Sequence, residues 1–446
     1  MTKSMTQGNP AKLIFLFALP LIIGNIFQQL YSMADTLIVG RTLGVNALAA
    51  VGCTGSITFF FLGFVMGFTS GLSIITAQRF GANDMEGVKR SFATSLLLCF
   101  GLTLLLTIGS FFYTKPILRL LQTPETIIDD AYAYLIVIFG GVAATIFFNF
   151  LSNMMRALGD SRVPLYFLIL TCVLNIILDY TCILVFHMGV AGAGVATIFS
   201  QFVSAVCCVI YIRKKMPVFW LKKEDFHLKR QDLSIHIKTA LPMAFQMSII
   251  AIGSLILQYA LNGLGATAIA AYTAAQKIDS IATMPLNSFG AAMATYTAQN
   301  YGAGKIDRIR KGVFQCILMS VGTSIVMGLM NFFFGGSLAS IFVGAGETEV
   351  LEYAKTFLSI NGILYWVLAL LFIYRFTLQG LGNGIVPTVA GIMELIMRAL
   401  GGILLVDLLG FTGAALSNPL AWIGACIPLC IAYYWNIKKL SARFKV

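Results

Sequence analysis

The sequence predicts an all-α polytopic membrane protein, with twelve transmembrane helices in two six-helix bundles related by a pseudo-twofold axis along the membrane normal. Two observations support this fold class. Of the 446 residues, 58% are hydrophobic and only 11% are charged, whereas a soluble domain has about 25% charged residues. The chain also contains twelve apolar runs and an internal repeat that divides them six and six. A soluble fold is therefore excluded.

Each apolar run is long enough to cross a bilayer, which takes about 20 apolar residues. Polar turns that contain glycine separate them, such as GANDMEG at 81–87 and LGDSR at 158–162. The first run continues past Pro20, which could allow the helix to bend, and it has no small-residue cleavage site, so we expect it to be retained. The runs cover residues 12–38, 47–76, 90–113, 131–158, 163–186, 190–212, 236–262, 267–297, 312–335, 351–379, 385–407 and 410–436.

Four pairs of similar segments reveal the repeat, each pair separated by 221–223 residues. The pairs are AQRFGANDMEGVKR (77–90) with AQNYGAGKIDRIRK (298–311), ALP (18–20) with ALP (240–242), LGDSRVP (158–164) with LGNGIVP (381–387), and MGVAGAGVA (188–196) with LGFTGAALS (409–417). Six helices per half is an even number, so both halves enter the membrane in the same orientation. We expect an N-lobe at 1–213, a cytoplasmic linker at 214–238 and a C-lobe at 239–446, an organisation typical of transporters that alternate access.

The net charge of +12 could indicate nucleic-acid binding, but the distribution of the basic residues argues against it. They gather in alternate loops and at the C-terminus, at 89–90, 213–215, 222–223, 229–230, 308–311 and 438–445. The opposite loops are richer in acidic residues. Positive charge marks cytoplasmic loops, so both termini and the linker are expected in the cytoplasm. We expect a multi-pass protein of the inner or plasma membrane that contacts the lipid bilayer and no nucleic acid.

Three polar side chains in the first half predict a cation site. Asp35 lies in the first run, and Asn175 and Asp179 share one face of the fifth, because residues four apart lie one helical turn apart. A charged residue at the centre of a membrane helix costs about 2.5–3.5 kcal/mol and normally marks a function. Thr197 on the next run could add a hydroxyl group. Asn175 could instead make an interhelical hydrogen bond.

Oxygen ligands of this kind suit a hard cation such as Na⁺. Two neighbouring carboxylates could equally bind and release a proton. We therefore expect Na⁺ or H⁺ as the coupling ion, and no cofactor or other metal. The nine cysteines support this, because all lie within apolar runs and none has CxxC spacing.

Other polar residues of the first half could face the same cavity and bind substrate. Gln28, Tyr31 and Asp35 fall at i, i+3 and i+7, which places them on one stripe of a helix. Asn149 and Asn153 form an i, i+4 pair on the fourth run. This pair could line the cavity or hold helices together.

The second half differs, because Leu257 and Gly402 occupy approximately the positions that match Asp35 and Asp179. It instead has a polar site made of Gln276, Asp279, Glu394 and Arg398. The last two are spaced for an intrahelical ion pair, which could be purely structural or could shape substrate selectivity. Arg375 lies near a cytoplasmic helix end, and we expect its side chain to extend to the membrane surface.

Several motifs resemble those of the multidrug and toxic compound extrusion (MATE) family, and the resemblance covers essentially the whole chain. They are ALP near the start of the first and seventh helices, QQLYSMADTLIVGRTLG at 28–44, AQxxGA at 77–82 and 298–303, and RALGDSRVP at 156–164. The chain is most similar to DinF-type and related small bacterial multidrug exporters. The most specific feature is Asp35 together with Asn175, Asp179 and Thr197.

The resemblance implies a role for each matching residue: Asp35, Asn175, Asp179 and Thr197 as the coupling site, Pro20 as the point of bending, and Gln28 and Tyr31 as part of the drug-facing wall. It also has a limit. Another bacterial branch of the family places essential carboxylates on helices seven and ten, where this chain has Gln246, Asn361 and Tyr365. Coupling through the second half is therefore not expected here.

The sequence thus predicts a secondary active antiporter, not an enzyme, that exports amphipathic, often cationic, organic compounds in exchange for Na⁺ or H⁺. We expect a monomer. The alternative within the same superfamily is a flippase for a lipid-linked saccharide or another lipid. A membrane enzyme or a channel is disfavoured, because the sequence contains neither a nucleophile–base motif nor a phosphate-binding loop, and its two repeats have diverged.

Overall fold

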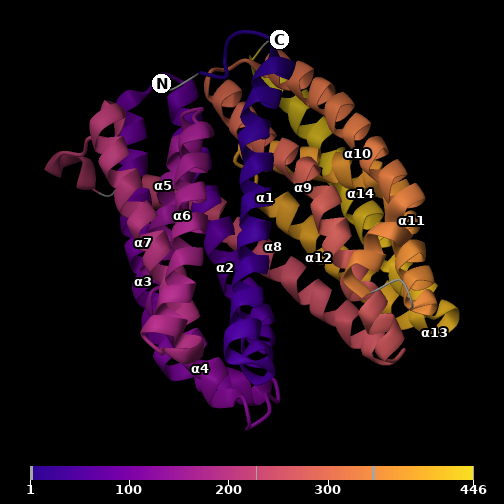
Figure 1. Cartoon of the computed structure of the whole chain (residues 1–446). Helices are drawn as coiled ribbons and strands as arrows, with labels where there is room; N and C mark the ends of the chain where they lie inside the picture. The colour runs from indigo at the N-terminus through magenta and orange to yellow at the C-terminus, as the bar shows by residue number, and fades with distance from the viewer. Residues whose placement is uncertain (1–3, 228, 344–346, 445–446) are drawn as a thin grey trace. The chain divides into compact units, whose positions relative to one another are not determined.

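The structure is a computed structural model that describes residues 4–227, 229–343 and 347–444 (Figure 1). The terminal residues of the predicted lobes and position 228 of the predicted linker lie outside the described residues. Within those ranges the chain forms helices and turns and contains no strand. This agrees with the physics of a bilayer, where a helix satisfies all backbone hydrogen bonds within one segment.

Seven α-helices and three short helical turns make up the described residues of the first half of the chain. They are α1 (Pro10–Leu43), α2 (Val45–Gly81), α3 (Met85–Leu120), α4 (Ile128–Gly140), α5 (Val142–Ala157), α6 (Arg162–Tyr180), η1 (Thr181–Val185), α7 (Gly189–Lys215), η2 (Pro217–Phe219) and η3 (Lys223–Phe226). The second half has α8 (Arg230–Asn262), α9 (Ala266–Gly302), α10 (Ile306–Val343), α11 (Thr348–Gly380), α12 (Ile385–Leu400), η4 (Gly401–Leu405), α13 (Val406–Leu409) and α14 (Phe411–Phe444).

All twelve predicted runs fall on these helical segments. Ten helices of the described chain are long and apolar enough to cross a membrane, and α4 with α5, which bend by 46° at their junction, can form an eleventh span. The remaining predicted run, 267–297, lies on α9, a helix of 37 residues. It is more polar than the others because it carries residues such as Gln276 and Asp279.

The internal repeat is visible in the backbone. Gly44 and Gly265 adopt φ values of 87° and 92° at matching positions, and Gly159 and Gly382 adopt 84° and 83°. Such left-handed conformations favour glycine, which explains why both repeats keep it in these turns. The π-helical turns η1 and η4 also follow the matching helices α6 and α12.

The chain forms two compact units, which differ from the predicted lobes at two segments. The first unit is Ile23–Ala240, so it includes the predicted linker. The second contains Leu241–Val446 together with Ser4–Ile22, which comprises the segment before α1 and the first turns of that helix.

Hydrogen bonds explain why the start of the chain belongs to the second unit. The backbone N–H of Met5 donates to Oε1 of Gln299 at 2.8 Å, and Nζ of Lys305 donates to the carbonyl of Thr6 at 2.9 Å. Both side chains come from the AQNYGAGK motif at the end of α9. The motif at 298–311 therefore anchors the N-terminal segment.

The matching motif of the first unit anchors the start of α8. Arg79 forms an ion pair with Asp232, and Oγ of Ser91 lies 2.7 Å from Nε2 of His236. The linker before α8 is held in the same unit, because the ring of Phe219 stacks on Phe92 with 4.4 Å between centroids. These contacts explain why residues 214–240 pack with the first unit.

Candidate functional site

The candidate ion site lies within the first unit, on α6. Asn175 and Asp179 are one turn apart on this otherwise apolar helix, and both side chains have no solvent-exposed surface. The π-helical turn η1 begins two residues after Asp179. Such turns widen a helix locally and are frequent at functional sites.

Asp35 of α1 lies beside Asp179, close enough for the two carboxyl groups to interact. Asp35 is 8% exposed. Adjacent carboxyl groups can share one proton, because a protonated carboxyl group donates a hydrogen bond and an ionised carboxylate accepts it. Oδ1 of Asp35 and Oδ1 of Asp179 have no hydrogen-bond partner within the described part of the chain. Two buried acceptor atoms are therefore available to a cation.

Asn175 links Asp179 to α7. With the amide turned to satisfy both of its ends, Nδ2 donates to Oδ2 of Asp179 at 3.0 Å and Oδ1 accepts from the backbone N–H of Thr197 at 3.2 Å. In the opposite orientation Nδ2 faces Oγ1 of Thr197 at 3.3 Å. The structure thus brings together all four residues predicted for the cation site.

Two tyrosines complete the surroundings of the carboxyl groups. The hydroxyl of Tyr31 lies 3.4 Å from Oγ1 of Thr197. Tyr134 of α4 is buried close enough to Asp35 and Asp179 to interact with both electrostatically. Sequence reasoning missed Tyr134, which lies on the buried stripe of α4 with Ala131, Leu135 and Ile138.

The other residues predicted to contact substrate are Gln28, Asn149 and Asn153. Gln28 is exposed on α1. Nδ2 of Asn149 donates to the carbonyl of Thr145 in its own helix, and Nδ2 of Asn153 donates to Oγ1 of Thr69 on α2. The Asn153 bond corresponds to the predicted alternative in which the pair holds helices together, whereas the Asn149 bond stays within α5. Pro20 is buried, and α1 remains helical through it.

In the second unit, the predicted ion pair on α12 is present and has a second partner. Glu394 accepts from Nη2 of Arg398 at 3.0 Å and from Nη2 of Arg375 at 2.7 Å. The expectation that Arg375 extends to the membrane surface is wrong, because its side chain is 4% exposed. Pairing with a buried carboxylate compensates the charge of the guanidinium without reaching water.

The other predicted acid of this unit is held by a short hydrogen-bonded chain. The hydroxyl of Tyr365 donates to Oδ1 of Asp279 at 2.6 Å and accepts from Nδ2 of Asn331 at 2.8 Å. Asp279 and Gln276 line a cavity of about 200 Å³, together with Glu394 and the two arginines paired with it. The C-lobe polar residues predicted from the sequence therefore share one cavity.

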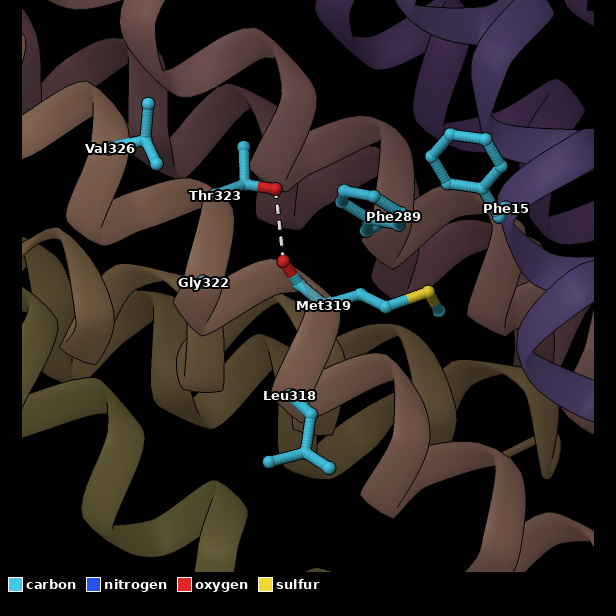
Figure 2. Close-up of a pocket in the computed structure, with 7 residues that line it drawn as sticks. All are labelled: Phe15, Phe289, Leu318, Met319, Gly322, Thr323 and Val326. Carbon is cyan, nitrogen blue, oxygen red and sulfur yellow. Dashed lines mark hydrogen bonds between the residues drawn. The ribbon is translucent and has the colours of Figure 1, made fainter.

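A larger recess of about 420 Å³ in the second unit is apolar (Figure 2). Its lining contains no charged side chain, and the hydroxyl of Thr323 donates to the carbonyl of Met319 in the same helix at 2.9 Å. The lining residues are Phe15, Phe289, Leu318, Met319, Gly322, Thr323 and Val326. A recess of this kind suits lipid chains and offers no group for binding an ion.

Comparison with known proteins decides the family. The sequence model of the MatE family matches residues 20–181 and 242–404, two segments whose starts are 222 residues apart. The chain belongs to the MatE family. MatE proteins are transporters, so this member is a transporter and not an enzyme.

Curated relatives of this MatE protein match most of its length. It is 29% identical over 393 residues to the "Probable multidrug resistance protein YpnP" of Bacillus subtilis, which covers 88% of this chain and 85% of the relative. It is 27% identical over 376 residues to the "Probable multidrug resistance protein NorM" of Thermotoga maritima, with 83% and 80% covered. A solved structure described as "MATE in complex with MaL6" superposes with a TM-score of 0.90 at 22% identity, covering 100% of both chains, which shows that the fold is shared.

Proposed function

We propose that the protein is a secondary active multidrug antiporter that exports amphipathic, often cationic, organic compounds in exchange for Na⁺ or H⁺. Export of varied drugs is supported by the names of its relatives, which are multidrug resistance proteins. We further propose that it acts as a monomer in the inner or plasma membrane with both termini in the cytoplasm, as the charge of its loops indicates.

Ion coupling is supported by one observation above all: Asp35 and Asp179 are buried in contact, and each has an oxygen without a partner among the described side chains. In our proposal, these carboxylates bind the coupling ion with oxygen atoms of Asn175 and Thr197. Na⁺ would use all four residues as ligands, whereas H⁺ would use the carboxylates alone. The chemistry of the donor set fits both ions.

Alternating access follows if the ion and the drug favour different states of the protein. A ligand shifts an equilibrium only by its difference in affinity for the two states. If the ion stabilises one state and the drug the other, each drives the release of the other. We place Gln28 and Tyr31 on the drug-facing wall, keep Asn149 and Asn153 as candidates there, and propose Pro20 as the point where α1 bends.

Proteoliposomes test ion coupling directly. The purified protein is reconstituted, and export of a fluorescent cationic dye is measured first with a Na⁺ gradient and then with a pH gradient. The gradient that drives export identifies the coupling ion. Asp35→Asn and Asp179→Asn should each slow export by about tenfold or more, because each removes a charged ligand. Asp130→Asn, an exposed acid at the start of α4, serves as the matched control. Wild-type rates in both site variants would end the coupling proposal.

The flippase alternative makes a different prediction in the same vesicles. A flippase would move a lipid-linked saccharide across the bilayer and would leave cationic dyes where they are. Measured dye export without movement of the lipid supports the antiporter.

A further inference from the structure

The apolar recess of Figure 2 is a hollow in the outer surface of the second unit, formed by α1, α9 and α10. Three of its lining side chains are about half exposed: Phe15 at 47%, Leu318 at 59% and Val326 at 60%. Apolar side chains that are exposed on a membrane helix face lipid tails, which are as apolar as they are. The proteins of a bilayer leave no water to fill such a hollow, so its occupant is apolar.

A glycine creates part of this hollow. Gly322 of α10 is exposed, and a Cβ atom built on it would meet nothing within 4 Å. The lining therefore lacks a side chain at the position where neighbouring turns of α10 present Leu318 and Val326. A flexible hydrocarbon chain fits a space of about 420 Å³ with walls of this kind.

The recess lies at the depth of acyl chains. Leu318 and Val326 follow Lys311 on α10, and at 1.5 Å per residue they lie about 10 and 22 Å from it along the helix axis. Lys311 belongs to the basic group at 308–311, which the loop charges place at the cytoplasmic surface. One leaflet contributes about 15 Å of hydrocarbon. The recess thus begins beneath the head groups of the cytoplasmic leaflet and extends to the middle of the bilayer.

Two lysines stand at the cytoplasmic end of the recess. Lys311 shares the lipid-facing stripe of α10 with Leu318, because residues seven apart lie on one face of a helix. Lys12 lies one turn before Phe15 on α1 in the same way. Both lysines are exposed, and neither forms an ion pair or a hydrogen bond within the described ranges of the chain.

A hydrogen bond brings the two lysines to neighbouring positions. The backbone N–H of Ala11 donates to Oε1 of Gln315 at 2.9 Å, so the first turns of α1 and α10 are in contact. Lys12 is adjacent to Ala11 in the chain, and Lys311 is one turn from Gln315. The acidic residue of this turn, Asp307, lies 3.9 Å from Arg310. Two ammonium groups therefore lie above the apolar recess with no carboxylate paired to either.

We propose that this groove is a binding site for one anionic phospholipid of the cytoplasmic leaflet. The ammonium groups of Lys12 and Lys311 donate to the phosphate oxygens of its head group, since lysine is a common ligand of phosphate. One acyl chain occupies the recess beside Gly322, between Phe15 of α1 and Leu318 of α10. The bound lipid joins the start of α1 to α10. This inference does not depend on the proposed export function.

The competing interpretation is that any surrounding lipid fills the recess without preference. Every membrane protein is covered by such lipids, and they exchange regardless of their head group. A built site differs from this in two ways, because it prefers a net negative head group and because it depends on the lysines and the recess together. Head-group charge and the two halves of the site are therefore the properties to vary.

Native mass spectrometry of the purified protein tests the preference, because it counts the lipids bound to each molecule. The protein in detergent is titrated with dioleoyl phosphatidylglycerol and, separately, with dioleoyl phosphatidylcholine, which has the same chains and no net charge. A lysine close to an anionic head group strengthens binding by about fivefold. Wild-type protein should bind the first phosphatidylglycerol about tenfold or more tighter than phosphatidylcholine. Equal affinities would overturn the proposal.

Variants of the lysines locate the head group. Lys12→Gln together with Lys311→Gln should remove the preference for phosphatidylglycerol, whereas Lys12→Arg together with Lys311→Arg should retain it. Arg310→Gln removes an exposed positive charge beside Lys311 and serves as the matched control, with an unchanged preference expected. A full preference in the double Gln variant would contradict the site. An equal loss in Arg310→Gln would also contradict it, because general surface charge would then explain the preference.

A variant of the recess locates the acyl chain. Gly322→Leu fills the hollow and should weaken binding of the first phosphatidylglycerol by about tenfold, because the chain loses its apolar contacts. Gly101→Leu is the control, since Gly101 is an exposed glycine of α3 at which a Cβ atom meets nothing within 4 Å. Wild-type affinity in Gly322→Leu would show that the chain binds elsewhere and would overturn the proposal.

Discussion

At the scale of single residues, Asn175 holds the carboxylate of Asp179 in position. Its amide uses one end to donate to the carboxylate and the other to accept from the backbone of α7 at Thr197. Asp179 is therefore fixed to the neighbouring helix without losing its unpartnered Oδ1. A site held in this way needs little reorganisation when an ion arrives.

Substitution of Asn175 tests this role. Asn175→Leu removes the hydrogen bond to Asp179 and one oxygen ligand, while it keeps the size of the side chain. We expect the concentration of coupling ion that gives half-maximal export to rise by about tenfold, because hydrogen bonds to charged groups are worth about 1.5–3 kcal/mol. The measurement is export rate against Na⁺ or H⁺ concentration in proteoliposomes.

Asn149→Leu provides the control, because Nδ2 of Asn149 donates to a carbonyl of its own helix. Its ion dependence should match the wild type. An unchanged ion dependence in Asn175→Leu would mean that the amide serves helix packing alone.

At the scale of the elements, glycines set how closely α10 and α11 approach. A Cβ atom at Gly328 of α10 would collide with the carbonyl group of Gly362 on α11. Pairs of small residues let membrane helices pack backbone to backbone, and packing is a main source of their association. In contrast, a Cβ atom at Gly322, six residues earlier on α10, would meet nothing within 4 Å.

Valine substitutions at these two glycines should therefore differ in their effect on stability. Gly328→Val forces α10 away from α11 and should lower the free energy of unfolding by about 1–3 kcal/mol, the usual cost of overpacking. Gly322→Val extends into the apolar recess of Figure 2 and should be nearly neutral. Thermal unfolding in detergent measures both. Similar unfolding midpoints for the two variants would contradict the close packing of α10 and α11.

Elements and site differ in how far the sequence could predict them. The helical runs were predictable because a bilayer leaves a spanning chain few alternatives to a helix, so hydropathy alone locates it. The break between α4 and α5 at Gly141 could not be predicted, because it depends on tertiary packing. A Cβ atom at Gly141 would collide with Ile198 of α7. A glycine within an apolar run does not by itself reveal that contact.

The same contrast holds at the two polar clusters. Asp35 and Asp179 could be predicted as site candidates because an ionisable residue in a membrane helix is rare, and Asn175 because it lies one turn from Asp179. The partner of Arg375 could not be found, since Glu394 is on another helix and sequence spacing reports only contacts within a helix. Tyr134 was missed for a similar reason, because tyrosine on a buried helix face is ordinary in a membrane protein.

At the scale of the whole molecule, loop charge predicts how the protein is inserted. Lys222 and Lys223 precede α8 in the linker, whereas Glu125, Asp129 and Asp130 lie in and beside the turn between α3 and α4. Lysine and arginine remain in the cytoplasm because they resist translocation, whereas acidic residues matter little. The linker should therefore be cytoplasmic and the turn after α3 external.

Cysteine labelling tests this orientation with two exposed positions. Lys223→Cys should react with a membrane-impermeant maleimide in inside-out vesicles but not in intact cells, and Glu125→Cys should react in intact cells. The nine native cysteines lie within apolar runs, so wild-type protein gives the background signal. The reverse pattern would place both termini outside and would contradict the predicted orientation. The direction of the proposed exchange is set by the ion gradient in either orientation, so the labelling experiment tests the predicted topology by itself.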